Sequence, residues 1–252
     1  MTYAITNELG RFIAGIHTAA IPEAAFENAR MGFADCVSVM IAGRGEEAPR
    51  LLAETLAAPA GDATLYLPGR TAPAPEAALI NGCAAHALDF DDVAVGGHPS
   101  TVFVPAIMAE AEHLGLAGEA MLRAYVAGYE AWAELSLREQ GSLHGKGWHP
   151  TGIWGAVGAA AACAALRGLD AEKATMAVAL GASMSAGIMA NFGTMTKPFH
   201  AGRAAQAGVL AARLAEAGFT ASPDAIEHPQ GLLSAVSPKG ETDRTARGLG
   251  ER

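Results

Sequence analysis

Apolar residues recur every three or four positions in successive segments of this chain, and this period most limits what it can fold into. Such spacing places apolar side chains on one face of an α-helix. Residues 22–43 follow it, with Pro22 at the start and Gly43 at the end, as is typical of a helix. Similar segments, bounded by Gly, Pro or Asp, cover residues 5–19, 46–58, 75–90, 100–115, 117–137, 151–167, 170–189 and 199–217. The pattern predicts an all-α, multi-helix domain with buried Ala- and Gly-rich central helices.

Two segments depart from this pattern. Thr64-Leu65-Tyr66-Leu67, closed by Pro68-Gly69, is typical of a short strand, but no obvious partner strand accompanies it. We expect a minor element there. Residues 174–196 carry no charge and are long enough to cross a bilayer. Because Gly, Ser, Asn and Thr interrupt their apolarity, they predict a buried helix rather than a membrane span.

The helical period fades after about residue 230, where the sequence becomes polar. We therefore predict two parts. Residues 1–230 form the helical domain that bears the site, and residues 231–252 form a polar tail that begins a linker to a further domain.

Composition excludes several classes of function. The net charge is -9 and no Lys/Arg-rich tract occurs, so binding to nucleic acid or to an anionic membrane is not expected. Charged residues make up only 17% of the chain, which predicts close-packed helices and an obligate oligomer. Cys36, Cys83 and Cys163 lie far apart, without zinc-site or disulfide spacing, and the first residues lack a signal-peptide pattern. These features predict a cytoplasmic protein.

Three polar clusters interrupt the Ala-rich sequence, and the first contains three acids. It runs from His86 to Asp92 and continues through Gly96-Gly97-His98-Pro99-Ser100. If the preceding helix continues through it, Asp89 and Asp92 share a face while Asp91 points elsewhere, so at most two acids converge. The cluster also fits a solvated helix end, with His98 or Ser100 capping the next helix. Spacing alone favours this second interpretation.

The second cluster is a glycine-rich loop that precedes a predicted helix. Residues 144–150 place His144, Lys146 and His149 near that helix N-terminus. Free N–H groups and the helix dipole at such a terminus can bind a carboxylate. His149 equally fits a helix cap beside Pro150.

The third cluster covers residues 191–200 and also leads into a helix. Thr194 and Thr196 provide hydroxyl groups, and Lys197 lies where the helix dipole disfavours a cation. We therefore expect a negative partner for Lys197, either a ligand or an aspartate. The alternative is a lysine that extends to solvent.

Together the clusters supply Asp89, His98, His149 and Lys197, an acid and three potential cations. Removing a proton next to a carboxylate creates a second negative charge, which cations or hydrogen bonds must stabilise. Imidazoles and an ammonium do so without a metal, and a histidine also serves as base or acid. We expect no metal and no cofactor.

Four ordered motifs resemble the MmgE/PrpD family over almost the whole chain: HALDFDD at 86–92, HPS at 98–100, GWHPT at 147–151 and GTMTKPFHAG at 193–202. The resemblance implies a helical domain, normally dimeric, whose pocket faces a lid domain inserted later in the chain. It implies a cofactor-free lyase of the 2-methylcitrate dehydratase type, acting on a small polycarboxylate by proton abstraction next to a carboxylate. A decarboxylase acting on a cis-aconitate-like acid, or an epimerase of iminodisuccinate type, is the alternative within the family.

The same resemblance implies roles for individual residues. Asp89 would orient the substrate or accept a proton, His98 and His149 would act in acid–base chemistry or carboxylate binding, and Lys197 would bind a substrate carboxylate. The expected substrate-binding residues are Ser100, Thr194, Thr196 and His200. Val93 stands where some relatives carry a polar residue, which puts an identical substrate in doubt. Relatives continue beyond the position of Arg252, so this chain is expected to lack the lid, or to need a separate lid-domain chain.

Three other interpretations compete. A terpenoid synthase or cyclase would also show the acids of residues 89–92, but 6% aromatic residues and the lack of a second acid-rich motif argue against it. An aconitase-like iron–sulfur hydratase would use three cysteines, yet their separation favours buried structural thiols. A helical scaffold that only dimerises would bind no citrate-like acid.

Overall fold

The computed structural model describes residues 3–67 and 69–250, and the predicted all-α class is confirmed within them. Pro68, predicted to follow a strand, and the outermost residues of the two predicted domains lie outside the described part. The helices are α1 (Ile5–Gly15), α2 (Glu23–Gly43), α3 (Glu47–Leu56), α4 (Ala74–Ala85), α5 (Ser100–Leu114), α6 (Glu119–Arg138), α7 (Pro150–Leu166), α8 (Ala171–Met184), α9 (Thr196–Glu216) and α10 (Leu232–Val236). Two 3₁₀ turns, η1 (His144–Lys146) and η2 (Met189–Asn191), precede α7 and α9.

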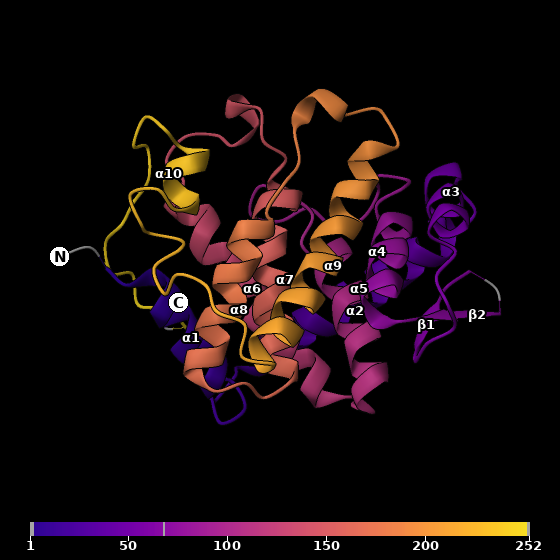
Figure 1. Ribbon diagram of the computed structural model, residues 1–252, viewed down its shortest axis with the longest axis horizontal. Coiled ribbons are helices and arrows are strands. Elements are labelled where there is room, and N and C mark those ends of the chain that lie inside the picture. Colours follow the sequence, from indigo (N-terminus) through magenta and orange to yellow (C-terminus); the bar gives the residue numbers. More distant parts are fainter. Residues whose placement is uncertain (1–2, 68, 251–252) are drawn as a thin grey trace.

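Helix α7 forms the centre of the bundle, and all 17 of its residues are buried. It contacts α9, α6, α8, α5 and α1 (Figure 1). Its sequence is apolar on every face, as expected of a helix surrounded by protein. The small residues let the neighbouring backbones approach closely: a Cβ on Gly152 would lie 2.0 Å from the carbonyl oxygen of Ala186. Packing of this kind fixes the N-terminus of α7, where His149 lies.

Helices α4 and α9 pack closely against each other and bring two of the polar clusters together. A Cβ on Gly202 of α9 would lie 2.1 Å from the carbonyl oxygen of Leu79 in α4, and one on Gly82 would lie 2.8 Å from the Cα of Gly202. The close approach places the end of α4, at His86, beside the start of α9, at Lys197.

Two predicted helices end five residues earlier than expected. The helix predicted over 75–90 ends at Ala85, and the one predicted over 170–189 ends at Met184. Three aspartates at a helix C-terminus would oppose the helix dipole, which gives a physical reason for the first ending. The expectation that Asp89 and Asp92 share a helix face is therefore wrong, because both lie in a loop.

The strand predicted at Thr64–Leu67 does have a partner. Strand β1 (Ala63–Leu65) pairs antiparallel with β2 (Arg70–Ala72), and Ala63 lies opposite Ala72. The sequence does not reveal this partner, because β2 has three residues and no alternating pattern. This hairpin lies beside α3, on the side of the molecule opposite α10 (Figure 1).

Residues beyond 230 pack against the helical body. Leu232, Leu233 and Val236 of α10 are buried. The guanidinium of Arg138 in α6 donates to the carbonyl oxygens of Asp243 at 3.0 Å and of residue 245 at 2.8 Å. The domain division at residue 230 and the linker role of 231–252 stay predictions.

Among the described helices, none is long and apolar enough to cross a membrane. Residues 174–196 are divided between α8, a loop containing η2 and the first residue of α9. The predicted buried thiols are confirmed: Cys36, Cys83 and Cys163 are buried and free.

Candidate active site

Segments far apart in the sequence meet at one end of α4, α7 and α9. His86 follows the last residue of α4, and the loop of residues 87–99 leads from it to α5. His149 precedes the first residue of α7, and Lys197 is the second residue of α9. The site is therefore built from helix ends, whose positions the packing of α4, α7 and α9 fixes.

The loop after α4 has an unusual backbone that protein contacts hold in place. Asp89 and Val95 have φ values of 56° and 46°, in the left-handed region that strains a residue other than glycine. The carbonyl oxygen of Val95 accepts hydrogen bonds from Trp132 Nε1 at 3.2 Å and Ser136 Oγ at 2.8 Å. The amide of His98 donates to Thr151 Oγ1 at 3.2 Å. These contacts with α6 and α7 fix the loop.

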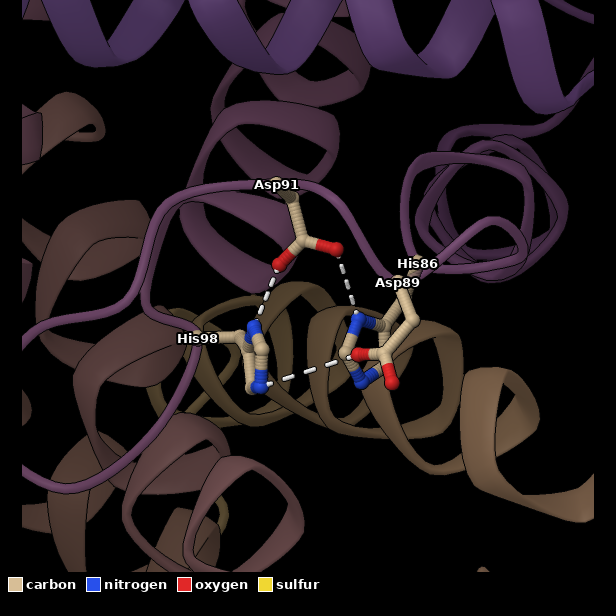
Figure 2. A group of neighbouring side chains, drawn as sticks. All are labelled: His86, Asp89, Asp91 and His98. Atoms are coloured by element: carbon tan, nitrogen blue, oxygen red, sulfur yellow. Dashed lines mark hydrogen bonds and ion pairs between the residues drawn. The ribbon is translucent and has the colours of Figure 1, made fainter. Parts of the chain in front are cut away.

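Asp91 lies at the centre of this loop and joins two imidazoles (Figure 2). Its Oδ1 lies 2.9 Å from His86 Nδ1 and its Oδ2 lies 2.6 Å from His98 Nδ1. Burial raises the pKa of Asp91, but the hydrogen bonds from His86 and His98 outweigh it and hold that pKa well below its usual range. Asp91 is therefore an ionised, buried anchor for both rings.

Lys197 and Asp89 form an ion pair at the open side of the cluster. The ammonium of Lys197 donates to Asp89 Oδ1, and that oxygen lies 3.9 Å from His98 Nε2. The Lys197 side chain is 12% exposed, whereas that of Asp89 is 52% exposed. Lys197 Nζ also lies 5.1 Å from the ring centroid of Phe192. Lys197 thus has the negative partner that its position predicted, and it does not extend to solvent.

His149 is buried between two other histidines. Its ring stacks on that of His86, with centroids 5.8 Å apart, and its Nδ1 lies 3.1 Å from His200 Nδ1. Burial, reinforced by the neighbouring His86 and His200, lowers the pKa of His149 to about 2. The imidazole is neutral at pH 7. It occupies the position before α7 but makes no side-chain capping bond.

Two buried imidazole nitrogens of the site, His86 Nε2 and His149 Nε2, have no hydrogen-bond partner among the described residues. Both residues are 1% exposed. Buried polar atoms in native proteins are nearly always hydrogen-bonded, so each nitrogen requires a ligand or a water molecule. The two nitrogens are therefore candidate contacts for a ligand or a water molecule.

The structure brings together the four residues predicted to be catalytic. Asp89, His98, His149 and Lys197 are connected through the contacts described above, with His200 directly against His149. Their catalytic roles stay predictions.

The remaining predicted substrate-binding residues lie differently. Ser100 is buried, donates to Asp92 Oδ2 at 2.8 Å and pairs with the Tyr125 hydroxyl at 2.7 Å. Asp92 and Tyr125 line a separate cavity of about 420 Å³ between α2 and α6. Thr194 Oγ1 donates to the carbonyl oxygen of residue 191 and accepts from the amide of Thr196, which holds the loop before α9. The polar groups of Ser100 and Thr194 are thus used within the protein.

Sequence reasoning missed His86 and Asp91 as site residues. A helix through residue 90 would direct Asp91 away from Asp89. Because we expected such a helix, we did not predict that Asp91 belongs to the site. The unfavourable placement of three acids at a helix C-terminus was the signal that the helix ends earlier.

We next consider whether this cluster could bind a divalent metal ion. His86, Asp89, Asp91 and His98 present ligand atoms within 4.8 Å of one another. However, both oxygens of Asp91 already hold imidazole nitrogens, and the Lys197 ammonium on Asp89 would repel a cation. The arrangement fits an anion beside Lys197 better than a metal ion.

Comparison with known proteins agrees with the motifs. The MmgE/PrpD N-terminal domain matches residues 7–245. Cis-aconitate decarboxylase of Homo sapiens is 34% identical over 172 residues, which cover 65% of this chain and 36% of the relative. Cis-aconitate decarboxylase of Aspergillus terreus is 25% identical over 247 residues, which cover 94% of this chain and 50% of the relative. The matched region thus spans about a third to a half of the length of these relatives. On the strength of the match over residues 7–245, this chain belongs to the MmgE/PrpD family.

Proposed function

We propose that this chain carries the active site of a lyase that removes a carboxyl group from a small unsaturated polycarboxylate of the cis-aconitate type. The observation that carries the proposal is the cluster itself: two imidazoles contact the buried Asp91, a third stacks on one of them, and an ammonium pairs with Asp89. Two relatives named cis-aconitate decarboxylase support decarboxylation over the dehydration that the sequence first suggested.

Lys197 binds a substrate carboxylate in this proposal. Its ammonium is held at the edge of the cluster by Asp89 and Phe192. An incoming carboxylate shares or takes over the position of Asp89 on Lys197. Because the surroundings are partly buried, this pairing is stronger than it would be in bulk water.

His98 and His149 differ in what they can contribute. His98 contacts ionised Asp91 through Nδ1, which orients the ring and leaves Nε2 as the atom that donates the proton. His149 is kept neutral by burial, and its unpartnered Nε2 is suited to hydrogen-bond a substrate oxygen. One histidine transfers the proton and the other stabilises charge.

Decarboxylation can be written as a balanced step that uses His98 and His149. As the carbon–carboxylate bond breaks and CO2 leaves, its electron pair forms a new carbon–carbon double bond. The electrons of the original double bond take the proton from His98 Nε2. Negative charge that develops on the remaining carboxylates lies near Lys197 and His149, which lowers the barrier.

The test is turnover by the full chain in heavy water, followed by proton NMR. cis-Aconitate should lose CO2 and gain one deuteron at carbon, whereas 2-methylcitrate, citrate and iminodisuccinate test dehydration and epimerisation. Lys197→Ala and His98→Gln should each lower kcat/KM by at least about 10²-fold. The matched controls are Lys239→Ala, at an exposed residue after α10, and His113→Gln, at a histidine paired with Asp62.

Full turnover by the Lys197→Ala or His98→Gln variant would overturn the proposed roles. If the full chain neither turns over nor binds any of these acids by calorimetry, the dimerising scaffold is the better interpretation.

We also propose that another protein surface covers the site. The support is the 52% exposure of the Asp89 side chain and the exposure of Phe90 and Val93 next to it. A homodimer and a separate lid-domain chain are the two sources. Sedimentation distinguishes them: a homodimer sediments as a dimer when the purified chain is alone, whereas a separate lid-domain chain changes the sedimentation only in an extract. A monomer that is fully active would contradict both.

A further inference from the structure

We propose that Asp91 is the positioning residue of this site: its one carboxylate fixes the tautomers of both His86 and His98 and leaves their Nε2 atoms to exchange protons or accept hydrogen bonds. The catalytic purpose of this positioning depends on the proposed function, whereas the assignment of the tautomers does not.

The tautomers follow from counting donors. A neutral imidazole has one N–H donor and one bare nitrogen, and an ionised carboxylate only accepts. Because Nδ1 of both rings lies within hydrogen-bond distance of Asp91, at 2.9 and 2.6 Å, both Nδ1 atoms carry the hydrogen. Both Nε2 atoms are then bare in the neutral rings. The two neighbouring acids have other partners, because Asp92 accepts from Ser100 and Asp89 accepts from Lys197.

Burial makes the arrangement rigid. The side chains of Asp91 and His86 are 0% exposed, so water does not compete for their hydrogen bond. The rings of His86 and His98 lie 4.4 Å apart, which disfavours a positive charge on both at once. Burial also lowers the pKa of His86, whereas His98 is 16% exposed and faces Asp89. His98 therefore carries the transferred proton while His86 remains neutral.

This assignment explains the unpartnered nitrogen of His86. With Nδ1–H committed to Asp91, His86 Nε2 is a bare acceptor inside the protein. It is suited to accept a hydrogen bond from a protonated substrate carboxyl group or a bound water molecule. Through a single side chain, Asp91 thus leaves His98 Nε2 for proton transfer and His86 Nε2 as an acceptor.

The experiment is nitrogen-15 NMR of the full chain with labelled histidine, which reports which ring nitrogen carries the hydrogen. Signals are assigned by their loss in His86→Gln and His98→Gln. In ligand-free protein at neutral pH, we expect Nδ1 to carry a hydrogen in both His86 and His98. An Nε2–H tautomer at both rings would overturn the proposal, and this measurement needs no variant of Asp91.

Asp91→Asn provides the second arm, with Asp92→Asn as the matched control on the adjacent residue. An asparagine amide donates to one ring, so we expect one of the two histidines to change to the Nε2–H tautomer. In Asp92→Asn both should keep Nδ1–H. Unchanged tautomers in a folded Asp91→Asn protein would contradict the proposal.

Activity then separates positioning from proton transfer. Asp91→Asn should lower kcat by about 10⁴-fold, the loss seen when the orienting aspartate of a Ser-His-Asp triad becomes asparagine, with less change in KM. If the wild-type tautomers are as expected but no acid is turned over, the proposed function fails and the positioning role of Asp91 stands.

Discussion

At the level of single residues, the site combines an ionised buried group, Asp91, with a neutral buried group, His149. Asp91 stays ionised because two imidazoles donate to it, whereas His149 stays neutral because burial, followed by the neighbouring His86 and His200, lowers its pKa. The difference is that hydrogen bonds favour the charged form of Asp91, whereas the histidines around His149 disfavour a positive charge on it.

The neutral state of His149 makes stability depend on pH. Its pKa is about 2 in the folded protein, against the ordinary histidine value of 6.5, so below pH 6.5 the unfolded chain binds a proton that the folded chain does not. Stability contributed by His149 is therefore present above pH 6.5 and lost as pH falls. Between pH 7.5 and 5.5, we expect His149→Gln to lose about 1.4 kcal/mol less unfolding free energy than wild type in urea titrations.

Phe192→Leu is the control for that comparison. The ring of Phe192 packs edge-on against His149, with centroids 4.8 Å apart, but it does not titrate. Its loss should lower the unfolding free energy by similar amounts at both pH values. Equal pH dependence in wild type and His149→Gln would show that His149 is not held neutral.

At the level of elements, the distance between α4 and α9 sets the distance between the clusters they carry. Gly202 lies where a Cβ would overlap the backbone of α4, 2.1 Å from the carbonyl oxygen of Leu79. Gly202→Ala must separate the helices, so we expect a loss of about 1–3 kcal/mol in unfolding free energy. The variant should also lose activity, because Lys197 moves relative to His86.

Gly15→Ala is the matched control. Gly15 ends α1, and a Cβ there would meet nothing within 4 Å. Alanine should leave stability unchanged or raise it by up to about 1 kcal/mol. Thermal unfolding of both variants beside activity assays makes the comparison, and a Gly202→Ala protein as stable as wild type would mean that the helices separate without cost.

The helices were predictable because their sequence signals are local. The buried part of the site, His86 and Asp91, was not predictable in this way. Periodicity and terminal Gly or Pro located α2, α5 and α7 within a few residues. The motifs also pointed to Lys197 and His149. The role of Asp91 was not predicted because it depends on where α4 ends. It also depends on a strained loop that places the ring of His98 against Asp91. The contacts of Ser100 with Asp92 and Tyr125 were not predictable for the related reason that tertiary packing decides which side chains it meets. Its predicted role in substrate binding stays a prediction.

At the level of the whole molecule, the site and the C-terminal segment lie on different parts of one packed body. The segment after α10 returns to α6, where the amide of Asp243 donates to the carbonyl oxygen of Arg138 at 2.8 Å. The Arg138 side chain is 0% exposed and also forms an ion pair with Glu134. Contacts of this kind are those of a folded segment, so the linker predicted over 231–252 can be tested directly by hydrogen exchange.

Arg138→Met should release this segment. Removing the guanidinium leaves the carbonyl oxygens of Asp243 and Thr245 without their donor and breaks the buried pair with Glu134. We expect a loss of about 3–5 kcal/mol in unfolding free energy and faster amide exchange over residues 231–247. Arg30→Met is the control, because Arg30 and Glu23 are 53% and 67% exposed and their pair should contribute less than about 1 kcal/mol. Rapid exchange over residues 231–247 in the wild-type protein would identify the segment as a linker instead.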